Sequence, residues 1–584
     1  MKRVLFLLYG LSCLFWHSLS AQLPIVMDMV HHNPGEAFTE SKFNDPNTLA
    51  QYGFNAQVVN EFQSVHTAIT YDSLNECICP VGSKERLWVD SIANRIQLKI
   101  KAIHKAGLEA YYFTDIIVLP KRLVEIYRDE ICDASGRVDF TREKTQEIHR
   151  IMLREIFKRF PTLDGLVIRV GETYLQNTPY HTGNGPIPRD EKSWEHNSLY
   201  KTDGGEAIHR CLINLLREEV CVRLNKKIFY RTWDFGYFHV NPQYYLNVTD
   251  SIEPHPNLYM CIKHVQGDYH RTFKFNPTLG IGRHKQVVEI ECQREYEGKG
   301  AYPNYIADGV LNGFEELKSD PHPYCLNHFK RNPLFAGIWT WSRGGGWRGP
   351  YIKNELWCDV NVAVLAKWAN NMSLTEKEII DWYAENHGFE GMDIKRFHQL
   401  ALLSADAIVR GRASLIMPIN VWWTRDQFIG GLKELKKNLE MIVTSGLTDK
   451  MITEKQESTN LWKKIVQLAN KIQTGHSEMR QYLRTSAEYG LLLYSIYEQG
   501  WIIMLKGYEG DKSGIYDVGT IEKAIAQYDL LWEKYSSFVK THADCATAYE
   551  PYSFDFNNPP QYHNLQEGLK PTVDRYRNIV KTEK

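Results

Sequence analysis

The sequence lacks, beyond its first residues, any apolar run long enough to cross a bilayer. It also lacks an excess of charge, because 69 Lys and Arg residues stand against 70 Asp and Glu residues and leave a formal net charge of −1. This balance gives no reason to expect a nucleic acid or an anionic membrane as partner. We find no internal repeat and no low-complexity tract. A chain of 584 residues is long enough for two or three domains of roughly 100–250 residues each.

Cysteine pairs with the spacing of a metal site are also missing. Cys77 and Cys79 are too close together to bridge easily, and no second pair lies near them. Other cysteines, such as Cys261 and Cys292, lie in apolar strand patterns, where a buried free thiol is the ordinary occupant. We therefore expect structural thiols or an occasional disulfide, no metal and no cofactor.

The N-terminal segment has the three parts of a secretory signal. Lys2 and Arg3 form a charged start, residues 4–16 are apolar, and small residues follow at Ser18 to Ala21. The sequence therefore predicts a signal peptide over residues 1–21, cleaved near residues 20–21, and an exported protein in the periplasm or outside the cell.

Eight strand-like runs, separated by helical or loop segments, occupy residues 22–350. Alternating strands and helices predict a parallel sheet, and eight repeats predict a closed (β/α)8 TIM barrel of the α/β class. An open doubly wound sheet is the alternative, but no Gly-x-Gly-x-x-Gly motif follows the first strand. The expected strands are Ile25–Val30, Phe54–Asn60, Glu109–Asp115, Leu166–Gly171, Lys227–Trp233, Leu258–His264, Val287–Gln293 and Phe335–Trp341.

Strand patterns stop after a glycine-rich loop that ends at Pro350. Residues 351–584 are expected to form a second, all-α domain. Its expected helices are Val360–Ala369, Thr375–Asn386, Ile394–Gly411, Arg425–Val443, Glu454–Gly475, Ser477–Leu505 and Ile521–Ser537.

Three acidic residues follow expected barrel strands at their C-terminal ends: Glu172, Asp268 and Glu295. Active sites of such barrels lie at this end. Paired carboxyl groups are what glycosidic cleavage requires, one to donate a proton and one to attack carbon or to deprotonate a water. For one acid alone, a structural ion pair is an equally good explanation. Three acids with three cations favour a catalytic site.

Those cations are Arg169, Arg231 and Lys263, on the fourth, fifth and sixth expected strands. They suit a substrate that bears a carboxylate, which arginine binds with a bidentate fork and lysine as a point charge. Alternatively, they neutralise the three acids. Aromatic residues make up 12% of the chain, which suits sugar stacking but also suits a large core. The other residues expected to bind substrate are Asn60, Glu61, His32, Trp233 and Trp341.

Several of these segments resemble the α-glucuronidases of glycoside hydrolase family 67. A lysine precedes an acid by five positions in Lys263 to Asp268, and Gln293-Arg294-Glu295-Tyr296-Glu297-Gly298 is similar to the segment that carries the family's second acid. The resemblance implies an inverting exo-α-uronidase, with Glu172 as acid, Asp268 and Glu295 placing the water, and Arg169, Arg231 and Lys263 receiving the uronate carboxylate. Further similar segments are residues 53–60, 105–112, 164–172, 230–233 and 359–368.

The chain departs from that family in several respects, and its Arg169–Glu172 spacing and its loop from Asp268 to Glu295 are each one residue shorter than expected. The N-terminal β-sandwich domain is missing, Arg169 stands where lysine is expected, and the first strand is followed by His31 and His32 instead of an aromatic residue. The resemblance therefore predicts the mechanism of this protein better than its substrate. A retaining or neutral-sugar glycosidase on the same barrel and a non-catalytic carbohydrate-binding protein remain as alternatives.

Overall fold

In the computed structural model of this chain, the described residues are 22–32, 41–61, 63–134, 136, 138–170, 178–182, 203–233, 237–320, 322–344, 352–419, 432–542 and 569–583. Several features expected from the sequence lie outside them: the signal peptide, the acid at Glu172, residues 345–350 of the glycine-rich loop, and residues 425–431 of the expected helix Arg425–Val443.

Eight parallel strands close into a barrel in the order in which they occur along the chain. Each strand pairs with the next, and β8 returns to pair with β1. The expected fold is thereby confirmed, with strand ends that differ by a few residues. The strands are β1 (Ile25–Val30), β2 (Ala56–Val59), β3 (Glu109–Asp115), β4 (Gly165–Arg169), β5 (Lys227–Arg231), β6 (Leu258–Lys263), β7 (Lys285–Glu291) and β8 (Phe335–Arg343).

Alternation along each strand decides which side chains face the barrel interior. On β7, Val287 belongs to the apolar cluster inside the barrel, whereas Val288 and Ile290 belong to the larger core outside it. Glu289 and Glu291 therefore share the inward face with Val287. Inward-facing Val167, Phe229 and Cys261 are likewise followed, two residues later, by the three expected cations, Arg169, Arg231 and Lys263.

Amphipathic helices surround the barrel and bury its outer face. The longest is α2, which begins after Ser83, whose side chain accepts a hydrogen bond from the backbone N–H of Arg86, and which buries isoleucines on one stripe. The helices of this layer are α1 (Pro46–Tyr52), α2 (Lys84–Lys105), α3 (Lys121–Ile131), α4 (Glu143–Arg159), α7 (Asp203–Leu216), α8 (Tyr237–Val240), α9 (Pro242–Thr249), α10 (Ala307–Asn312) and α11 (Leu326–Phe329).

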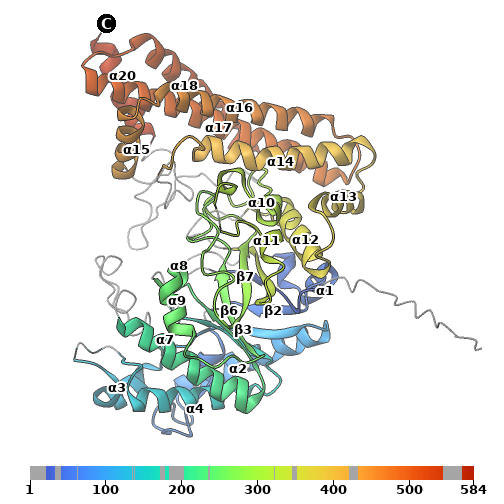
Figure 1. The fold of residues 1–584 in the computed structure, drawn as a ribbon, viewed down its shortest axis with the longest axis vertical. Helices are drawn as coiled ribbons and strands as arrows, with labels where there is room; N and C mark the ends of the chain where they lie inside the picture. Colours follow the sequence, from blue (N-terminus) through green and yellow to red (C-terminus); the bar gives the residue numbers. More distant parts are fainter. Residues whose placement is uncertain are drawn as a thin grey trace, which may run out of the picture.

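The chain continues as helices after the barrel, as expected. Figure 1 shows the long helices of this part as a layer across one end of the barrel. The helices that follow the barrel are α12 (Leu356–Asn370), α13 (Glu376–Asn386), α14 (Met392–Arg412), α15 (Leu432–Thr444), α16 (Thr448–Lys471), α17 (Ser477–Ser513), α18 (Val518–Thr541) and α20 (Lys570–Thr582). Helices α3, α8, α9, α11 and α20 were not expected from the sequence.

The helical layer contacts the loops that follow β6 and β7. Arg271 donates from Nη1 to the backbone oxygen of Ala405 on α14 at 2.7 Å, and Tyr482 of α17 donates to the backbone oxygen of Gly300 at 2.8 Å. Both loops start at the C-terminal ends of strands. The helices therefore cover the end of the barrel at which active sites of this architecture lie.

Asn361 of α12 is fully buried and binds the loop after β7 with every polar atom of its side chain. Its Nδ2 donates to the backbone oxygens of Cys292 and Asn304 at 3.2 and 3.0 Å. Its Oδ1 accepts from the backbone N–H groups of Ile306 and Ala307 at 3.0 and 3.2 Å. The first helix after the barrel thus fixes the conformation of a barrel loop.

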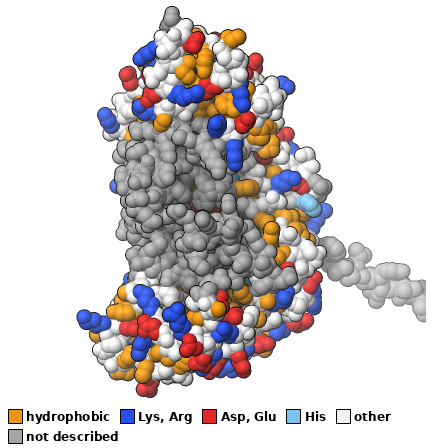
Figure 2. All heavy atoms as spheres, turned by 90° about the vertical axis from the view of Figure 1, so that its left-hand side faces the viewer, with side chains coloured by type: hydrophobic (Ala, Val, Ile, Leu, Met, Phe, Trp, Pro, Cys, Tyr) orange, Lys and Arg blue, Asp and Glu red, His pale blue; other side chains and the backbone are white. Residues whose placement is uncertain are grey.

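Within the described segments, no helix has the length and apolar character that a membrane crossing needs. Figure 2 shows Lys and Arg side chains interspersed with Asp and Glu side chains on the described parts of one face. This mixture agrees with the formal net charge of −1.

Asp28 is a fully buried carboxyl group between β1 and β8. It accepts hydrogen bonds from the hydroxyls of Thr340 and Ser342 at 2.6 and 2.8 Å. Burial raises the pKa of Asp28 from its ordinary 3.8 to about 7, even though both hydroxyls act to lower it. The folded protein therefore holds this proton at a pH at which the unfolded chain has lost it.

We expect Asp28→Asn to stabilise the protein more at pH 8 than at pH 5. The free energy of unfolding of the wild type should fall by up to about 4 kcal/mol as the pH rises from about 4 to about 7. In this range the Asp28 carboxyl group ionises in the unfolded chain but stays protonated in the folded protein. Asparagine stays neutral and removes this loss. Thermal unfolding of both proteins at the two pH values measures the effect, and an equal difference in Tm at both would contradict it.

Candidate active site

Asp268 lies in the loop after β6 and forms an ion pair with Lys263, the last residue of that strand. Its other carboxylate oxygen accepts a hydrogen bond from the Tyr296 hydroxyl at 2.5 Å. Burial acts to raise the pKa of Asp268, but the Lys263 ammonium and the Tyr296 hydroxyl outweigh it and hold the pKa at about 2. Asp268 is therefore ionised at neutral pH.

Glu291, the last residue of β7, has the opposite environment. Its side chain is fully buried, Oε2 accepts the backbone N–H of Glu295 at 3.3 Å, and Oε1 has no hydrogen-bond partner among the described residues. Burial raises the pKa of Glu291 to about 8, with the charge of Arg294 opposing this shift and the charge of Asp268 adding to it. Glu291 is therefore protonated at neutral pH.

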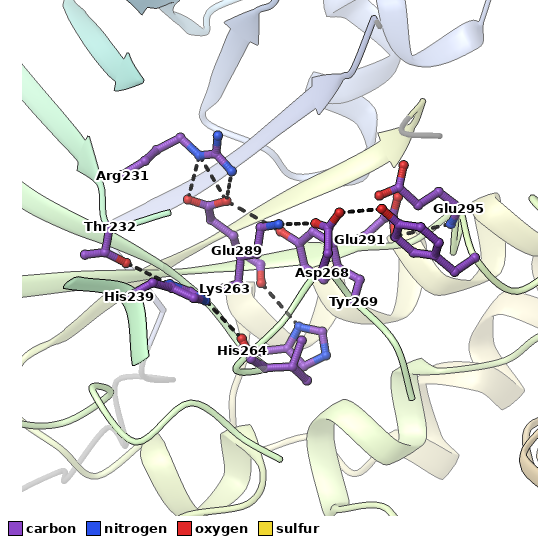
Figure 3. A network of polar contacts seen from close by, with 12 residues as sticks. Arg231, Thr232, His239, Lys263, His264, Asp268, Tyr269, Glu289, Glu291 and Glu295 are labelled. Carbon is purple, nitrogen blue, oxygen red and sulfur yellow. Dashed lines mark hydrogen bonds and ion pairs between the residues drawn. The ribbon is translucent and has the colours of Figure 1, made fainter. Parts of the chain in front are cut away.

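Figure 3 shows Asp268 and Glu291 within one network of polar contacts at the ends of β6 and β7. The negative charge of Asp268 acts directly on Glu291. Two carboxyl groups whose pKa values are pushed apart are the arrangement that general acid–base chemistry requires. The pair can supply a proton and an anionic oxygen in one site at neutral pH.

The backbone beside this pair is strained. Five non-glycine residues of the described chain have positive φ, and three lie in the loops after β6 and β7: Tyr269 at 60°, Arg294 at 59° and Lys299 at 52°. Tyr269 follows Asp268 directly, and Arg294 precedes Glu295. Such conformations cost energy and persist only where the surroundings enforce them, often at functional sites.

Glu297 holds the two strained loops together. It accepts the backbone N–H of Arg271, in the loop after β6, at 2.9 Å. In the loop after β7, it accepts from Arg294 Nη2 at 2.6 Å and from Asn304 Nδ2 at 3.0 Å. Its side chain is almost fully buried, so these contacts fix the relative positions of the two loops.

Each of the three cations expected in the site has a carboxylate partner. Arg169 binds Asp115 with Nε and Nη2 at 2.5 and 2.8 Å, and Arg231 binds Glu289 with the same two atoms at 3.0 and 2.8 Å. Lys263 pairs with Asp268. The sequence analysis identified neither Asp115 nor Glu289 as a partner of these arginines.

Aromatic rings surround the Lys263 ammonium. Its Nζ lies 3.6 Å from the Trp233 ring centroid, 4.6 Å from that of Tyr269 and 5.7 Å from that of Trp341. Ring faces attract cations, most strongly where water is excluded, and Lys263 is 1% exposed. The lysine is therefore held as a buried charge beside Asp268.

We expect Lys263→Met to move the acidic limb of the pH–activity profile to higher pH. Without the ammonium, burial of Asp268 is no longer compensated, so its pKa rises and the ionised form is lost at a higher pH. The measurement is kcat/KM from pH 3 to 8. Lys227→Met, which removes a lysine paired with Glu109 at the other end of the barrel, is the control. Identical acidic limbs in all three proteins would contradict the role given to Lys263.

The remaining expected residues are distributed around the barrel mouth. Asn60 follows β2 and is buried, Glu61 pairs with Lys99 of α2, and Trp341 stacks on His31 with ring centroids 4.7 Å apart. His32 follows β1, and Trp233 follows β5 beside Lys263. Glu295 is buried, and its backbone N–H donates to the Glu291 carboxyl group. Glu172 lies outside the described residues.

The sequence did not predict Glu291 as a catalytic residue or Tyr296 as a hydrogen-bond partner of Asp268. The available signal for Glu291 was the period of two along β7, which places it on the inward face with Val287.

No cluster of three or more His, Cys, Asp or Glu side chains within the described ranges could hold a metal ion.

No family model matches the chain, and no curated protein matches it. Among solved structures, it is similar to an enzyme of family GH138 that targets pectin rhamnogalacturonan II, with 10% identity, a TM-score of 0.56, and coverage of 96% of this chain and 84% of the other. An O-GlcNAc hydrolase of Thermobaculum terrenum matches with 10% identity, a TM-score of 0.39, and coverage of 96% and 94%. A chitobiase of Flavobacterium johnsoniae matches with 11% identity, a TM-score of 0.31, and coverage of 86% and 75%. The chain therefore has a fold found in glycoside hydrolases, and none of the matches named here is of family 67.

Proposed function

We propose that this protein is a glycoside hydrolase in which Glu291 donates a proton and Asp268 acts as the anionic partner. The observation that carries the proposal is the contrast between two carboxyl groups at the C-terminal end of the barrel: Asp268 binds the Lys263 ammonium and the Tyr296 hydroxyl, whereas Oε1 of the buried Glu291 has no partner among the described residues. These surroundings lower the pKa of Asp268 and raise that of Glu291. The strained backbone at Tyr269 and Arg294 supports it, because such strain is often found at functional sites.

The reaction follows from the two protonation states. The Glu291 proton passes to the glycosidic oxygen as the bond to the anomeric carbon breaks, and the leaving sugar departs as an alcohol. Asp268 deprotonates a water that attacks this carbon, which inverts its configuration. The products are a sugar hemiacetal and an alcohol, and the proton taken up by Asp268 returns Glu291 to its acid form through solvent.

The finer proposal is that an exo-acting enzyme removes a terminal α-linked uronic acid from an oligosaccharide outside the cytoplasm. Support comes from the resemblance of the segments around Lys263, Asp268 and Glu295 to α-glucuronidases. The name of the polymer targeted by the similar GH138 enzyme also denotes galacturonate units. Glu172 keeps its expected role as an alternative proton donor, and export follows from the expected signal peptide.

A screen of the purified protein against oligosaccharides with terminal uronic acids and with terminal neutral sugars tests the proposal. We expect hydrolysis of at least one α-uronide and a product whose first NMR-detected anomer is β. Binding of such oligosaccharides without release of any sugar would contradict the enzymatic proposal and favour a carbohydrate-binding protein.

A further inference from the structure

A cleft lies at the junction between the barrel and the helical layer. Its volume is about 600 Å³, and it is lined by the loop after β6, by α10 with the residues on either side of it, and by α14. Figure 1 shows α10 and α14 next to each other at this junction. Small-molecule sites have volumes of about 300–1,000 Å³, so the cleft is large enough for such a ligand. Neither Asp268 nor Glu291 lines it.

The walls of the cleft are held by contacts between the barrel loops and α14. Arg271, in the loop after β6, donates from Nη1 to the backbone oxygen of Ala405 at 2.7 Å, and its guanidinium carbon lies 4.0 Å from the Phe314 ring centroid. The backbone N–H of Tyr305 donates to the Ser404 hydroxyl at 3.1 Å. The cleft is therefore preorganised, which lowers the entropy cost of binding a ligand.

The charges of the lining cancel, because three cationic and three acidic side chains contribute to it. Each of the cations is paired with a carboxylate: Arg271 with Glu316, Lys318 with Glu315, and Arg410 with Glu457. An anionic ligand would have to displace these carboxylates, and a cationic ligand would meet cations that are already paired. The lining therefore favours a neutral ligand.

Two polar side chains of the lining retain the capacity to bind a ligand. Asp308 Oδ1 accepts a hydrogen bond from Asn312 Nδ2 at 2.7 Å, whereas Asp308 Oδ2 has no hydrogen-bond partner among the described residues. Gln399 is exposed on α14, and its amide makes no hydrogen bond to any residue that the structure describes. This amide supplies both a donor and an acceptor. Together the two side chains can bind neighbouring hydroxyl groups.

Apolar surface lies beside these polar groups. Leu402 of α14 is 37% exposed, and Leu403 and the Phe314 ring also line the cleft. Sugars present C–H groups on the faces of their rings and hydroxyl groups at the edges. An apolar side chain next to a free carboxylate oxygen and a free amide complements both parts of a sugar.

We propose that this cleft is a carbohydrate-binding site separate from the catalytic pair, which binds neutral sugar residues of the polymer on which the enzyme acts. The inference goes beyond the proposed function and rests on it for the identity of that polymer. Asp308 Oδ2 accepts from one sugar hydroxyl, the Gln399 amide binds another, and Leu402 contacts the C–H face. The catalytic pair and the cleft then bind different parts of one chain.

The position of Arg271 connects the cleft to the catalytic pair. Arg271 follows Asp268 by three positions in the same loop, and its backbone N–H donates to Glu297, which also binds Arg294 in the loop after β7. A polymer held in the cleft is therefore kept near the catalytic end of the barrel. Two contacts with one chain raise the effective concentration of the second contact, so the cleft favours long substrates and leaves short ones unaffected.

Isothermal titration into Glu291→Gln tests the cleft without turnover. The probes are xylotetraose, cellotetraose, galactotetraose and mannotetraose, with inorganic phosphate as the anionic probe. We expect at least one tetrasaccharide to bind, and to bind about 10-fold or more weakly when Gln399→Ala or Asp308→Asn is added, because each change removes a hydrogen bond to the sugar. Asp308→Asn keeps the acceptor for Asn312. Lys395→Ala, one turn before Gln399 on α14 and outside the lining, is the matched control and should leave binding unchanged.

Steady-state kinetics adds a readout that is specific to long substrates. It compares kcat/KM for a polymer with kcat/KM for a disaccharide that carries the same terminal sugar. In Gln399→Ala the ratio of the two should fall about 10-fold through a higher KM for the polymer, with the disaccharide unaffected. Lys395→Ala should keep the ratio of the wild type.

The proposal would be overturned if no tetrasaccharide bound, or if the cleft variants bound as tightly as the control. Phosphate binding that Arg410→Met abolishes would assign an anion site instead, and an unchanged kinetic ratio would overturn the role of the cleft in binding the polymer. In these cases hydrolysis of a glycoside would leave the proposed function standing. Tetrasaccharide binding that depends on Asp308 and Gln399, in a protein that hydrolyses no glycoside, would support the cleft and overturn the proposed function.

Discussion

Replacement of Glu291 by glutamine is expected to lower kcat about 10²–10⁴-fold on an oligosaccharide whose leaving group needs a proton. The change keeps the shape of the side chain and the acceptor for the Glu295 N–H, and it removes the proton to be donated. An aryl glycoside with an acidic phenol as leaving group should lose much less. Steady-state kinetics with both substrates measures the contrast.

The pH profile provides an independent check on Glu291. Activity that depends on its protonated form should be lost as the pH rises through about 8, and Glu291→Gln should lack this basic limb. Glu172→Gln is the competing variant. If it shows the leaving-group contrast and Glu291→Gln does not, Glu172 is the proton donor and the role proposed for Glu291 is wrong.

Asp268→Asn is the second variant for which we expect a very large effect, a loss in kcat of about 10²–10⁴-fold on good and poor leaving groups alike. The amide of asparagine cannot deprotonate the attacking water. A substrate with a better leaving group does not compensate for the loss of this base. Because the charge of Asp268 contributes to the raised pKa of Glu291, residual activity should also show a basic limb at lower pH than in the wild type.

Mass spectrometry of the protein during turnover of a slow substrate separates two roles for Asp268. An inverting enzyme forms no covalent intermediate, so the protein mass should not change. A glycosyl adduct on Asp268 would identify it as a nucleophile and predict retention of the anomeric configuration. This result would keep the glycosidase proposal and overturn its inverting mechanism.

The barrel could be predicted because its signal is local. Near-continuous apolar runs such as Leu258–His264 and Val287–Gln293 are typical of strands buried on both faces, and they recur eight times with helices between them. The acid after β6 could be predicted for the same reason, since Lys263 and Asp268 are five residues apart and pair within one loop. Where one strand and the loop that follows it form a site, the sequence is sufficient to predict that site.

The partners of the arginines depend on contacts between strands that are far apart in sequence. Asp115 reaches Arg169 because β3 and β4 pair with these two residues in register. Glu289 reaches Arg231 across the barrel interior from β7 to β5, which are not neighbours. The residue types alone did not decide whether the three cations bind substrate or neutralise acids. Only the closed barrel shows which carboxylate each cation contacts.

The pKa of Glu291 depends equally on tertiary structure. Glu291 and Glu295 are similar in sequence, both following an apolar run, and the spacing favoured Glu295 through its resemblance to family 67. Strand β7 extends to Glu291, whose side chain faces the barrel interior and is fully buried. The period of two along β7 indicates that Glu291 faces inward, but the closed barrel causes the burial that raises its pKa, and no local pattern reports that burial.

The bonds of Asn361 mean that the barrel and the helices cannot be treated as interchangeable modules. A shortened protein that ended after β8 would expose the loop carrying Glu295 and would lack the amide that holds the backbone oxygens of Cys292 and Asn304. Transplanting this barrel onto another C-terminal domain would have the same effect. Efforts to shorten this protein, or to recombine its barrel with other domains, should therefore keep α12 together with the barrel.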